Sequence, residues 1–195
     1  MDFGEPFGGL IPGARGAALA VLLRTGAPLT GRRVHALIAD RHSLGAVQKA
    51  LRDLDRLGLI MTEAIGRAGV HRINEGHAAI SPLRALVSPI EMLTRVVEET
   101  ARGVEAVIVF GSVGRGDAHA DSDIDLVVIA PESWDGRAEL QQQVQERLGN
   151  DCDVLHLSSD HFKLAPEDRE PVVAEILRDG IALVGTMPRR RRAAS

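Results

Sequence analysis

Two carboxylates one residue apart point to metal chemistry in this chain. Asp123 and Asp125 lie in the apolar segment 123–130, directly after a glycine-rich stretch. Side chains two residues apart in a strand point to the same face, so these two carboxylates would repel each other unless a cation lies between them. Hard divalent ions such as Mg²⁺ or Mn²⁺ prefer carboxylate oxygens and complete their shell with water and substrate phosphates. The pattern therefore predicts a metal site for a phosphorylated substrate.

A third carboxylate can join this site from a later strand. Asp153 begins the apolar segment 153–157, and a strand there that lies beside the first would bring three carboxylates together. Such a group can hold two metal ions roughly 4 Å apart, the arrangement that stabilises in-line phosphoryl transfer. Asp151 lies two positions earlier on the same face and remains an alternative third acid.

The glycine-rich stretch supplies a phosphate site. Gly111 and Ser112 follow the apolar segment 104–110, at a place where a short helical turn is expected. Backbone N–H groups at such a junction bind phosphate oxygens, glycine permits close approach, and a serine hydroxyl adds a donor. The predicted substrate is therefore a nucleotide that brings its metal with it.

These residues resemble the signature of the nucleotidyltransferases of the DNA polymerase β superfamily, which is Gly-Ser, ten residues, and then Asp-x-Asp. Here the Gly-Ser pair at 111–112 is followed by ten residues and by Asp-Ile-Asp at 123–125. The stretch looks most like the small minimal nucleotidyltransferases, whose loop usually reads Gly-Ser-x-Ala-Arg-Gly, with Gly114 in place of the alanine. The resemblance covers about residues 104–186.

The resemblance implies roles for individual residues. It gives metal-binding and catalytic roles to Asp123, Asp125 and Asp153, and nucleotide-binding roles to Gly111, Ser112 and Arg115. It also implies Mg²⁺ or Mn²⁺ as the cofactor, ATP as the expected substrate, and transfer of AMP to an acceptor hydroxyl. Small members of this family often act as antitoxins that modify a partner toxin protein, and others modify antibiotics, so both kinds of acceptor remain open.

The segments around these residues alternate as in an α+β domain with a mixed sheet flanked by helices. Strands are expected at 104–110, 123–130, 152–157 and 181–185, and helices at 138–149 and 170–180. Leu140, Val144 and Leu148 give the first of these helices an apolar stripe that would pack on the sheet.

The front half of the chain predicts three helices followed by a hairpin. Helices are expected at 16–26, 31–39 and 43–58, and strands at 59–65 and 70–74. Thr30 and Ser43 are expected N-caps, and Gly58 is expected to end the third helix. This order resembles the bacterial winged-helix regulators over about residues 14–80, which implies an N-terminal winged helix-turn-helix domain that binds DNA and a protein that forms a homodimer.

In that resemblance the third helix would enter the major groove and the hairpin would lie along the DNA backbone. Gln48 and Arg52 suit base edges, whereas Lys49 and the hairpin residues suit phosphates. The predicted DNA-binding residues are Ser43, Gln48, Lys49, Arg52, Arg67 and Arg72, with His71 beside them on the hairpin. A helical bundle used for dimerisation or partner docking is the alternative for this segment.

The charge balance separates the two halves. Residues 1–80 carry 10 Lys and Arg against 7 Asp and Glu, whereas residues 81–195 carry 13 against 20. A basic front half and an acidic back half suggest two tasks. We therefore expect a winged helix-turn-helix domain at 1–80, a linking helix at 81–103 that Pro89 bends or restarts, a nucleotidyltransferase domain at 104–186 and a disordered basic tail at 187–195.

The composition excludes several classes of protein. The single cysteine, Cys152, rules out an internal disulfide and a multi-cysteine zinc site, and no segment is apolar over the length that spans a bilayer. A cytoplasmic location is expected. A function from a different class also remains open, namely a transcriptional regulator whose nucleotidyltransferase-like domain only senses nucleotide.

Overall fold

The structure, a computed structural model, describes residues 1–66, 68–164 and 171–187. Its contacts divide the chain into two compact units. The front unit is Glu5–Pro89, and the back unit combines Met1–Gly4 with Ile90–Ser195. Arg67, which is predicted to bind DNA, lies outside the described residues. So does the tail from residue 188 onward, which is predicted to be disordered.

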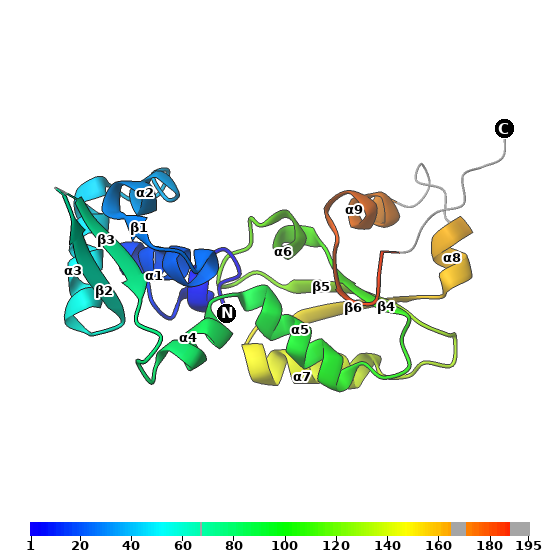
Figure 1. The fold of residues 1–195 in the computed structure, drawn as a ribbon. Coiled ribbons are helices and arrows are strands. Elements are labelled where there is room, and N and C mark those ends of the chain that lie inside the picture. Colours follow the sequence, from blue (N-terminus) through cyan, green and yellow to red (C-terminus); the bar gives the residue numbers. More distant parts are fainter. Residues whose placement is uncertain (67, 165–170, 188–195) are drawn as a thin grey trace. The chain divides into compact units, whose positions relative to one another are not determined.

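The front unit contains a short three-stranded antiparallel sheet and five helical segments (Figure 1). Along the chain its elements are η1 (Pro6–Gly9), α1 (Gly13–Thr25), β1 (Leu29–Thr30), α2 (Gly31–Ala36), α3 (Leu44–Arg56), β2 (Ile60–Ile65), β3 (Ala68–Ile73) and α4 (Ile80–Leu86). The sheet order is β1-β3-β2. The helices and the hairpin lie where the sequence predicts them, whereas η1 and the two-residue β1 were not expected.

Local sequence explains where the front helices begin. The hydroxyl of Thr30 accepts a hydrogen bond from the backbone N–H of Arg33, and the hydroxyl of Ser43 accepts one from Ala46. Each hydroxyl satisfies an N–H group that has no partner within the helix, which confirms both predicted caps. The buried residues of α3 are Val47, Ala50, Leu51 and Leu54, and this face joins the core of the front unit.

The back unit is a four-stranded mixed sheet with helices, as the sequence predicts (Figure 1). Its elements are α5 (Pro89–Thr100), β4 (Ala106–Val109), α6 (Gly111–Arg115), β5 (Ile124–Ile129), α7 (Arg137–Leu148), β6 (Cys152–Leu157), α8 (Ser159–Leu164), α9 (Pro171–Asp179) and β7 (Ile181–Val184). The sheet order is β6-β5-β4-β7. β5 and β6 are parallel, and the other two pairings are antiparallel.

The linking helix expected at 81–103 is instead two helices in different units. α4 belongs to the front unit, while α5 packs in the back unit from Ile90 onward. Pro89 begins α5. A proline is favoured in the first turn of a helix, where its missing N–H group is not needed, and it disfavours helix in the residue before it.

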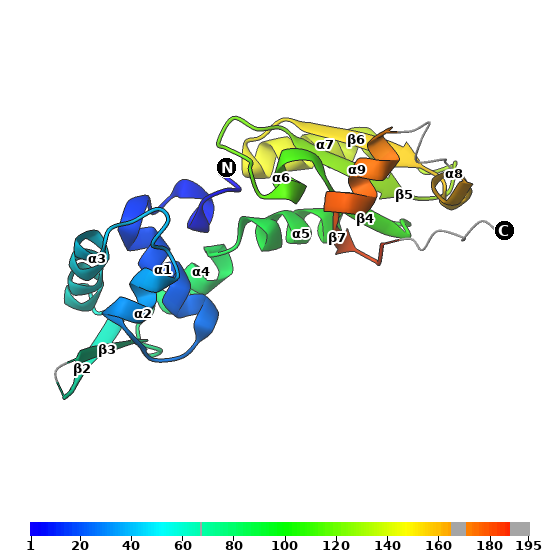
Figure 2. The ribbon, with the colours of Figure 1, turned by 90° about the horizontal axis from the view of Figure 1, so that it is seen from above.

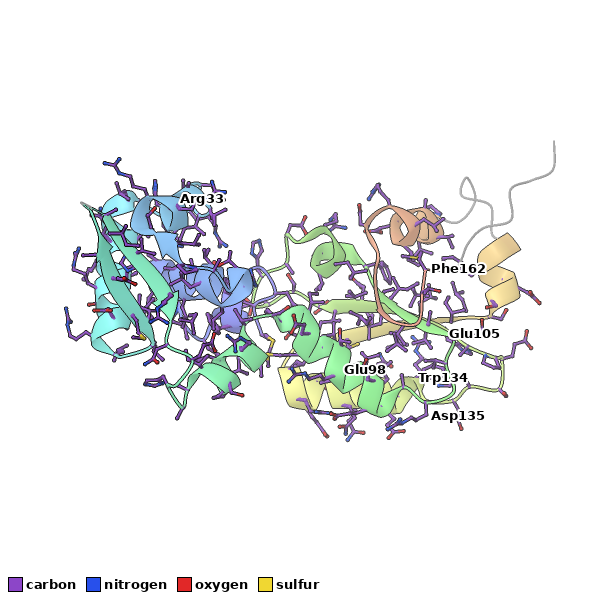
Figure 3. The ribbon with its side chains drawn as sticks, viewed as in Figure 1. Arg33, Glu98, Glu105, Trp134, Asp135 and Phe162 are labelled. Atoms are coloured by element: carbon purple, nitrogen blue, oxygen red, sulfur yellow. The ribbon has the colours of Figure 1, made fainter. Side chains whose placement is uncertain are left out.

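The two faces of the back sheet are covered by different helices. Alternate strand residues such as Val107 and Leu126 pack with α5 and α7 in one apolar cluster. Their neighbours, such as Ile108 and Val127, pack with α9 in another cluster. The helix α8 is not among the predicted elements. Its Phe162 is fully buried in that second cluster (Figure 3). The central strands β4 and β5 are therefore covered on both faces, which explains their nearly continuous apolar sequences.

The first four residues of the chain pack on the back unit. Phe3 lies against its main apolar cluster. The buried Asn150 donates to the carbonyl oxygens of Met1 at 3.1 Å, Ala120 at 3.3 Å and Ser122 at 3.0 Å. One amide group therefore fastens both the N-terminal segment and the loop that leads into β5. No helix in the described part of the chain is long and apolar enough to cross a membrane.

Candidate active site

Two of the predicted carboxylates lie on adjacent strands at the same level. In the parallel pairing of β5 with β6, Asp125 is the partner of Asp153. Asp123 precedes Asp125 by two residues and therefore points to the same side of the sheet. Asp125 is half-buried, whereas Asp123 and Asp153 are exposed. The fold thus brings together the three carboxylates that the sequence singles out.

The electrostatics of Asp125 reflect this arrangement. Burial raises the pKa of Asp125, and the nearby carboxylates of Asp153, Glu175 and Asp123 raise it further, while Arg115 lowers it. Each of these carboxylates disfavours the ionised form of Asp125. A cation placed among them would reverse that effect.

The carboxylates fit a metal that arrives with its substrate better than a metal held by protein alone. Among the described residues, no three His, Cys, Asp or Glu side chains form a closed metal-binding group. Mg²⁺ usually keeps several waters and takes only one or two carboxylates plus substrate phosphates. Asp125 with Asp123 or Asp153 supplies that number of oxygen ligands.

The turn at Gly111 lies against Asp125. Gly111 has a φ of 61°, in the left-handed region, and begins α6. A Cβ atom at this position would collide with the Oδ2 atom of Asp125. Only glycine therefore allows the carboxylate and the turn to be this close. Ser112, the next residue, is half-buried.

Arg115 ends α6 and is held by two acids. Its Nη1 atom lies 2.6 Å from an oxygen of Glu175 on α9, and its Nε atom lies 3.2 Å from an oxygen of Asp117. The hydrogen bond that Arg115 donates to Asp117, together with the charges of both acids, raises the pKa of Arg115. Glu175 is not predictable from the sequence, because it lies on a helix sixty residues away and no spacing pattern connects it to α6.

Gly114 explains why α9 and α6 are so close. Figures 1 and 2 show the two helices side by side. A Cβ atom on Gly114 would lie 2.7 Å from the carbonyl oxygen of Asp179, at the end of α9. The glycine that replaces the alanine of the expected loop pattern therefore makes room for α9, and α9 brings Glu175 to Arg115.

Cys152 and His156 lie near the carboxylates but have structural surroundings. Burial, together with the charges of Asp153 and Asp125, raises the pKa of Cys152 to about 12, so its thiol stays protonated at neutral pH. The Nε2 atom of His156 lies 3.3 Å from the carbonyl oxygen of Ala130. Its ring packs edge-on against that of Trp134.

Comparison with known proteins agrees with this geometry. Residues 91–186 match the family model described as "Polymerase beta, Nucleotidyltransferase". This match begins in α5 and includes the whole candidate site. A curated relative, "Protein adenylyltransferase MntA" of Shewanella oneidensis, is 31% identical over 67 residues, which are 33% of this chain and 48% of the relative. The matched part thus spans about half the length of that relative.

Solved structures are also similar to about half of this chain. One is described as "Crystal structure of the toxin-antitoxin with AMP-PNP", with 23% identity, a TM-score of 0.38 and coverage of 50% of this chain and 74% of that chain. Another contains a tri-AMPylated Shewanella oneidensis HEPN toxin in complex with MNT antitoxin. It has 22% identity, a TM-score of 0.34 and coverage of 50% of this chain and 70% of that chain.

The residues predicted to bind DNA lie on the front unit, outside the matched residues 91–186. Gln48, Lys49 and Arg52 are exposed on α3, and Arg72 is exposed on β3. Ser43 is also exposed, although its hydroxyl is engaged in capping α3.

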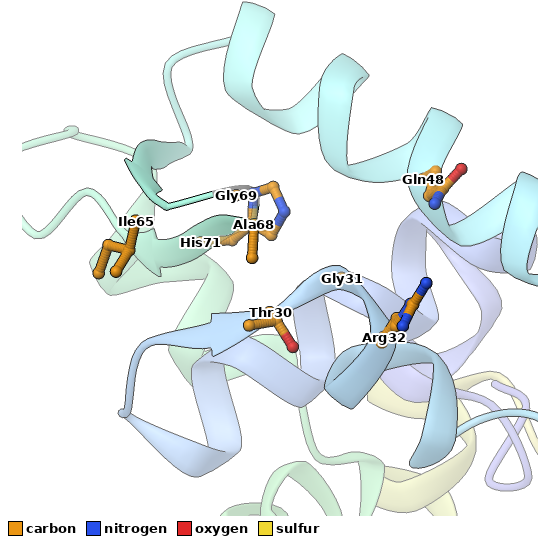
Figure 4. A pocket seen from close by; sticks show the side chains of 8 residues that line it. All are labelled: Thr30, Gly31, Arg32, Gln48, Ile65, Ala68, Gly69 and His71. Atoms are coloured by element: carbon orange, nitrogen blue, oxygen red, sulfur yellow. The ribbon is translucent and has the colours of Figure 1, made fainter.

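A groove of about 590 Å³ separates the hairpin from α2 and α3 (Figure 4). It is lined by Thr30, Gly31, Arg32, Gln48, Ile65, Ala68, Gly69 and His71. The Nδ1 atom of His71 lies 3.0 Å from the hydroxyl of Thr62. Burial lowers the pKa of His71, and Asp55 offsets part of that effect. The groove thus has a lining of polar and apolar residues, with one histidine whose neutral form is favoured.

Proposed function

We propose that this protein transfers AMP from ATP to a hydroxyl group of a partner protein. The observation that carries the proposal is the pairing of Asp125 with Asp153 beside the turn at Gly111. Metal-binding carboxylates and a phosphate-binding turn at one place are what phosphoryl transfer requires. The similarity to a protein adenylyltransferase supports the choice of AMP and of a protein acceptor.

Each residue of the site has a role in this proposal. Asp123, Asp125 and Asp153 would hold Mg²⁺ or Mn²⁺. Bound there with ATP, the metal would neutralise phosphate charge and favour loss of the proton from the acceptor hydroxyl. The backbone N–H groups at Gly111 and the hydroxyl of Ser112 would bind phosphate oxygens. Arg115 would contact the phosphates by exchanging its ion pair with Glu175 for one with the nucleotide.

Transfer of labelled nucleotide tests the proposal. The full chain is incubated with ATP labelled at the α-phosphate, Mg²⁺ or Mn²⁺, and candidate acceptors, including a HEPN toxin of the kind present in the similar complexes and a set of hydroxyl-bearing antibiotics. Covalent label on a protein supports the proposal. Label only on an antibiotic would show a small-molecule nucleotidyltransferase instead, and no label on any acceptor would contradict the activity.

We further propose that the front unit is a winged helix-turn-helix domain that binds DNA. Three helices followed by an antiparallel hairpin support this assignment. So do the exposed polar side chains of Gln48, Lys49 and Arg52 on α3. In this arrangement α3 would contact base edges, and the hairpin with Arg67 and Arg72 would contact phosphates.

Binding to the upstream region of the protein's own gene tests the DNA proposal. Arg52→Ala should reduce discrimination between sequences, because a guanidinium reads guanine edges. Lys49→Ala should weaken all sequences alike and reduce the salt dependence, because it removes a phosphate contact. No binding at low salt would favour a partner-docking role. A change in DNA affinity on adding ATP, without any transfer of label, would favour the nucleotide-sensing regulator.

A further inference from the structure

A second groove lies at the edge of the catalytic sheet and has no role so far. It has a volume of about 560 Å³ and opens beside β6. Its lining consists of Asp123, Ala138, Gln141, Gln142, Gln145, Asp151, Cys152 and Asp153. It therefore combines two of the three catalytic carboxylates with one face of α7.

The glutamines that line this groove form one row on α7. Ala138, Gln141, Gln142 and Gln145 follow the spacing of one helix face. The Nε2 atom of Gln145 donates to Asp151 at 2.7 Å, and that of Gln141 donates to the carbonyl oxygen of Cys152 at 2.7 Å. These bonds fix the wall of the groove next to Asp153, so the groove is a built feature of the fold.

The position of the groove suits the attacking group. The sheet order β6-β5-β4-β7 places the carboxylates of β5 and β6 between the groove, at the β6 edge, and α6, which follows β4. In-line displacement at phosphorus requires the attacking oxygen and the leaving pyrophosphate on opposite sides. With the phosphates at α6, the attacking hydroxyl enters from the β6 edge.

The charge of the groove limits what can enter it. Three carboxylates line it, and none of its lining residues in the described part of the chain is Lys or Arg. ATP with one Mg²⁺ keeps a net negative charge, which adds to the carboxylates. A nucleic acid end would be repelled, because its phosphates would meet no cation there. A side chain flanked by Lys or Arg would be attracted.

We propose that this groove is the acceptor site and that it selects a protein hydroxyl flanked by basic residues. The proposal rests on the transferase function proposed above and gives its acceptor a chemical class. The hydroxyl oxygen attacks the α-phosphorus of ATP, a new P–O bond forms, pyrophosphate leaves with the electrons of the broken bond, and the hydroxyl proton passes to solvent.

Two lysine variants on α7 form a matched test. Gln142→Lys places a positive charge in the groove, whereas Gln143→Lys places one on the neighbouring residue, which does not line it. Both glutamines donate to Glu146, so both lysines have the same partner within reach. The probes are fluorescent peptides with a single Tyr, Ser or Thr hydroxyl flanked either by Arg and Lys or by Asp and Glu. Their binding to the full chain is measured by anisotropy with ATP and Mg²⁺.

The basic peptide should bind more tightly than the acidic one. Gln142→Lys should weaken its binding about fivefold, as expected for one added charge at a solvent-exposed site, while Gln143→Lys should leave it unchanged. ATP affinity, measured by calorimetry, should be the same in all three proteins.

Several results would overturn the acceptor site. In the peptide measurements, these are equal effects of the two lysine variants on binding, tighter binding of the acidic peptide, or no binding of the basic peptide at millimolar concentration. Covalent label on an RNA 3′ hydroxyl would also overturn it, and so would a loss of ATP affinity in Gln142→Lys alone. Binding does not depend on turnover. Peptide binding that follows the expected pattern without transfer of label would therefore contradict the transferase function and leave the groove assignment standing.

Discussion

The carboxylate of Asp125 lies against the backbone of Gly111, so closely that no side chain can stand between them. The metal-binding strand and the phosphate-binding turn of the proposed site are therefore in direct contact. A change in either one alters the other, and this coupling gives the site consequences that can be measured.

Replacing Asp123 and Asp125 together by Asn should reduce AMP transfer by roughly a hundredfold or more, because the metal loses two of its charged ligands. Folding should be retained or improved. Burial and neighbouring carboxylates raise the pKa of Asp125, so its ionised form disfavours the folded state at neutral pH. Labelled transfer and thermal melting measure the two effects. Asp135→Asn, at an exposed site away from the groove, is the control, and transfer at the wild-type rate in the double variant would refute the metal site.

The third acid is distinguished by comparing Asp153→Asn with Asp151→Asn. Asp153 is the register partner of Asp125, whereas Asp151 is bound by Gln145 in the groove wall. The first variant should therefore lower kcat, and the second should mainly raise KM for the acceptor. Steady-state kinetics with Mg²⁺ varied separates these effects. The opposite pattern would assign the metal to Asp151.

Gly111→Ala should abolish measurable ATP binding, because the added methyl group collides with Asp125. Gly103→Ala is a matched control, since Gly103 has a similar φ of 69° but open space around its Cβ position. Both variants carry a left-handed alanine, at a backbone cost of roughly 1–2 kcal/mol, and only the first one disturbs the site. Calorimetry with Mg²⁺ and ATP compares them, and equal affinities would remove the turn from the nucleotide site.

Glu175→Gln should raise the affinity for ATP about fivefold, because it releases Arg115 and removes a negative charge near Asp125. The double variant Arg115→Ala with Glu175→Gln should lose this gain. Calorimetric titration of both proteins measures it. A lower affinity in Glu175→Gln would mean that the ion pair positions Arg115 for the nucleotide instead of competing with it.

Acid should destabilise the front unit through His71. Burial lowers the pKa of His71 in the folded state, so below its usual value of about 6.5 the unfolded chain takes up the proton first. The contribution of His71 to the free energy of unfolding is fully present above about pH 6.5. It is lost as the pH falls toward the pKa of His71 in the folded state. Urea unfolding followed by the amide NMR signals of β2 and β3 should show this loss as the pH falls below about 6.5. The loss should be smaller in His71→Gln, and an equal slope in both proteins would assign it to other groups.

Local patterns predicted most elements because their causes are local. Thr30 and Ser43 cap the helices that follow them, and β4 and β5 are almost entirely apolar because these central strands are covered on both faces. β1 is only two residues long, and it is a strand only because β3 pairs with it. The packing of Met1–Gly4 with residues beyond Ile90 depends on contacts distant in sequence, which no local pattern encodes.

The candidate site divides in the same way. The acids at 123 and 125 and the turn at Gly111 belong to one short motif, and this made them visible in the sequence. Asp153 was proposed from its place at the start of a strand, and parallel pairing places it beside Asp125. Glu175 reaches Arg115 only through the packing of α9 on α6. The glutamine row of α7 belongs to no sequence motif, and only the packing of α7 beside β6 brings it to the groove.

The attachment of Met1–Gly4 to the back unit also determines the order in which the protein is completed during synthesis. These residues leave the ribosome long before Asn150, whose side chain binds the carbonyl oxygen of Met1. The whole of Glu5–Pro89 is made in between. The front unit is thus complete first, while the segment before it waits for its partners. A chain that ends before Asn150 would have a finished front unit and an unanchored loop ahead of Asp123, so the candidate site would be completed only after residue 150 and β6 have been made.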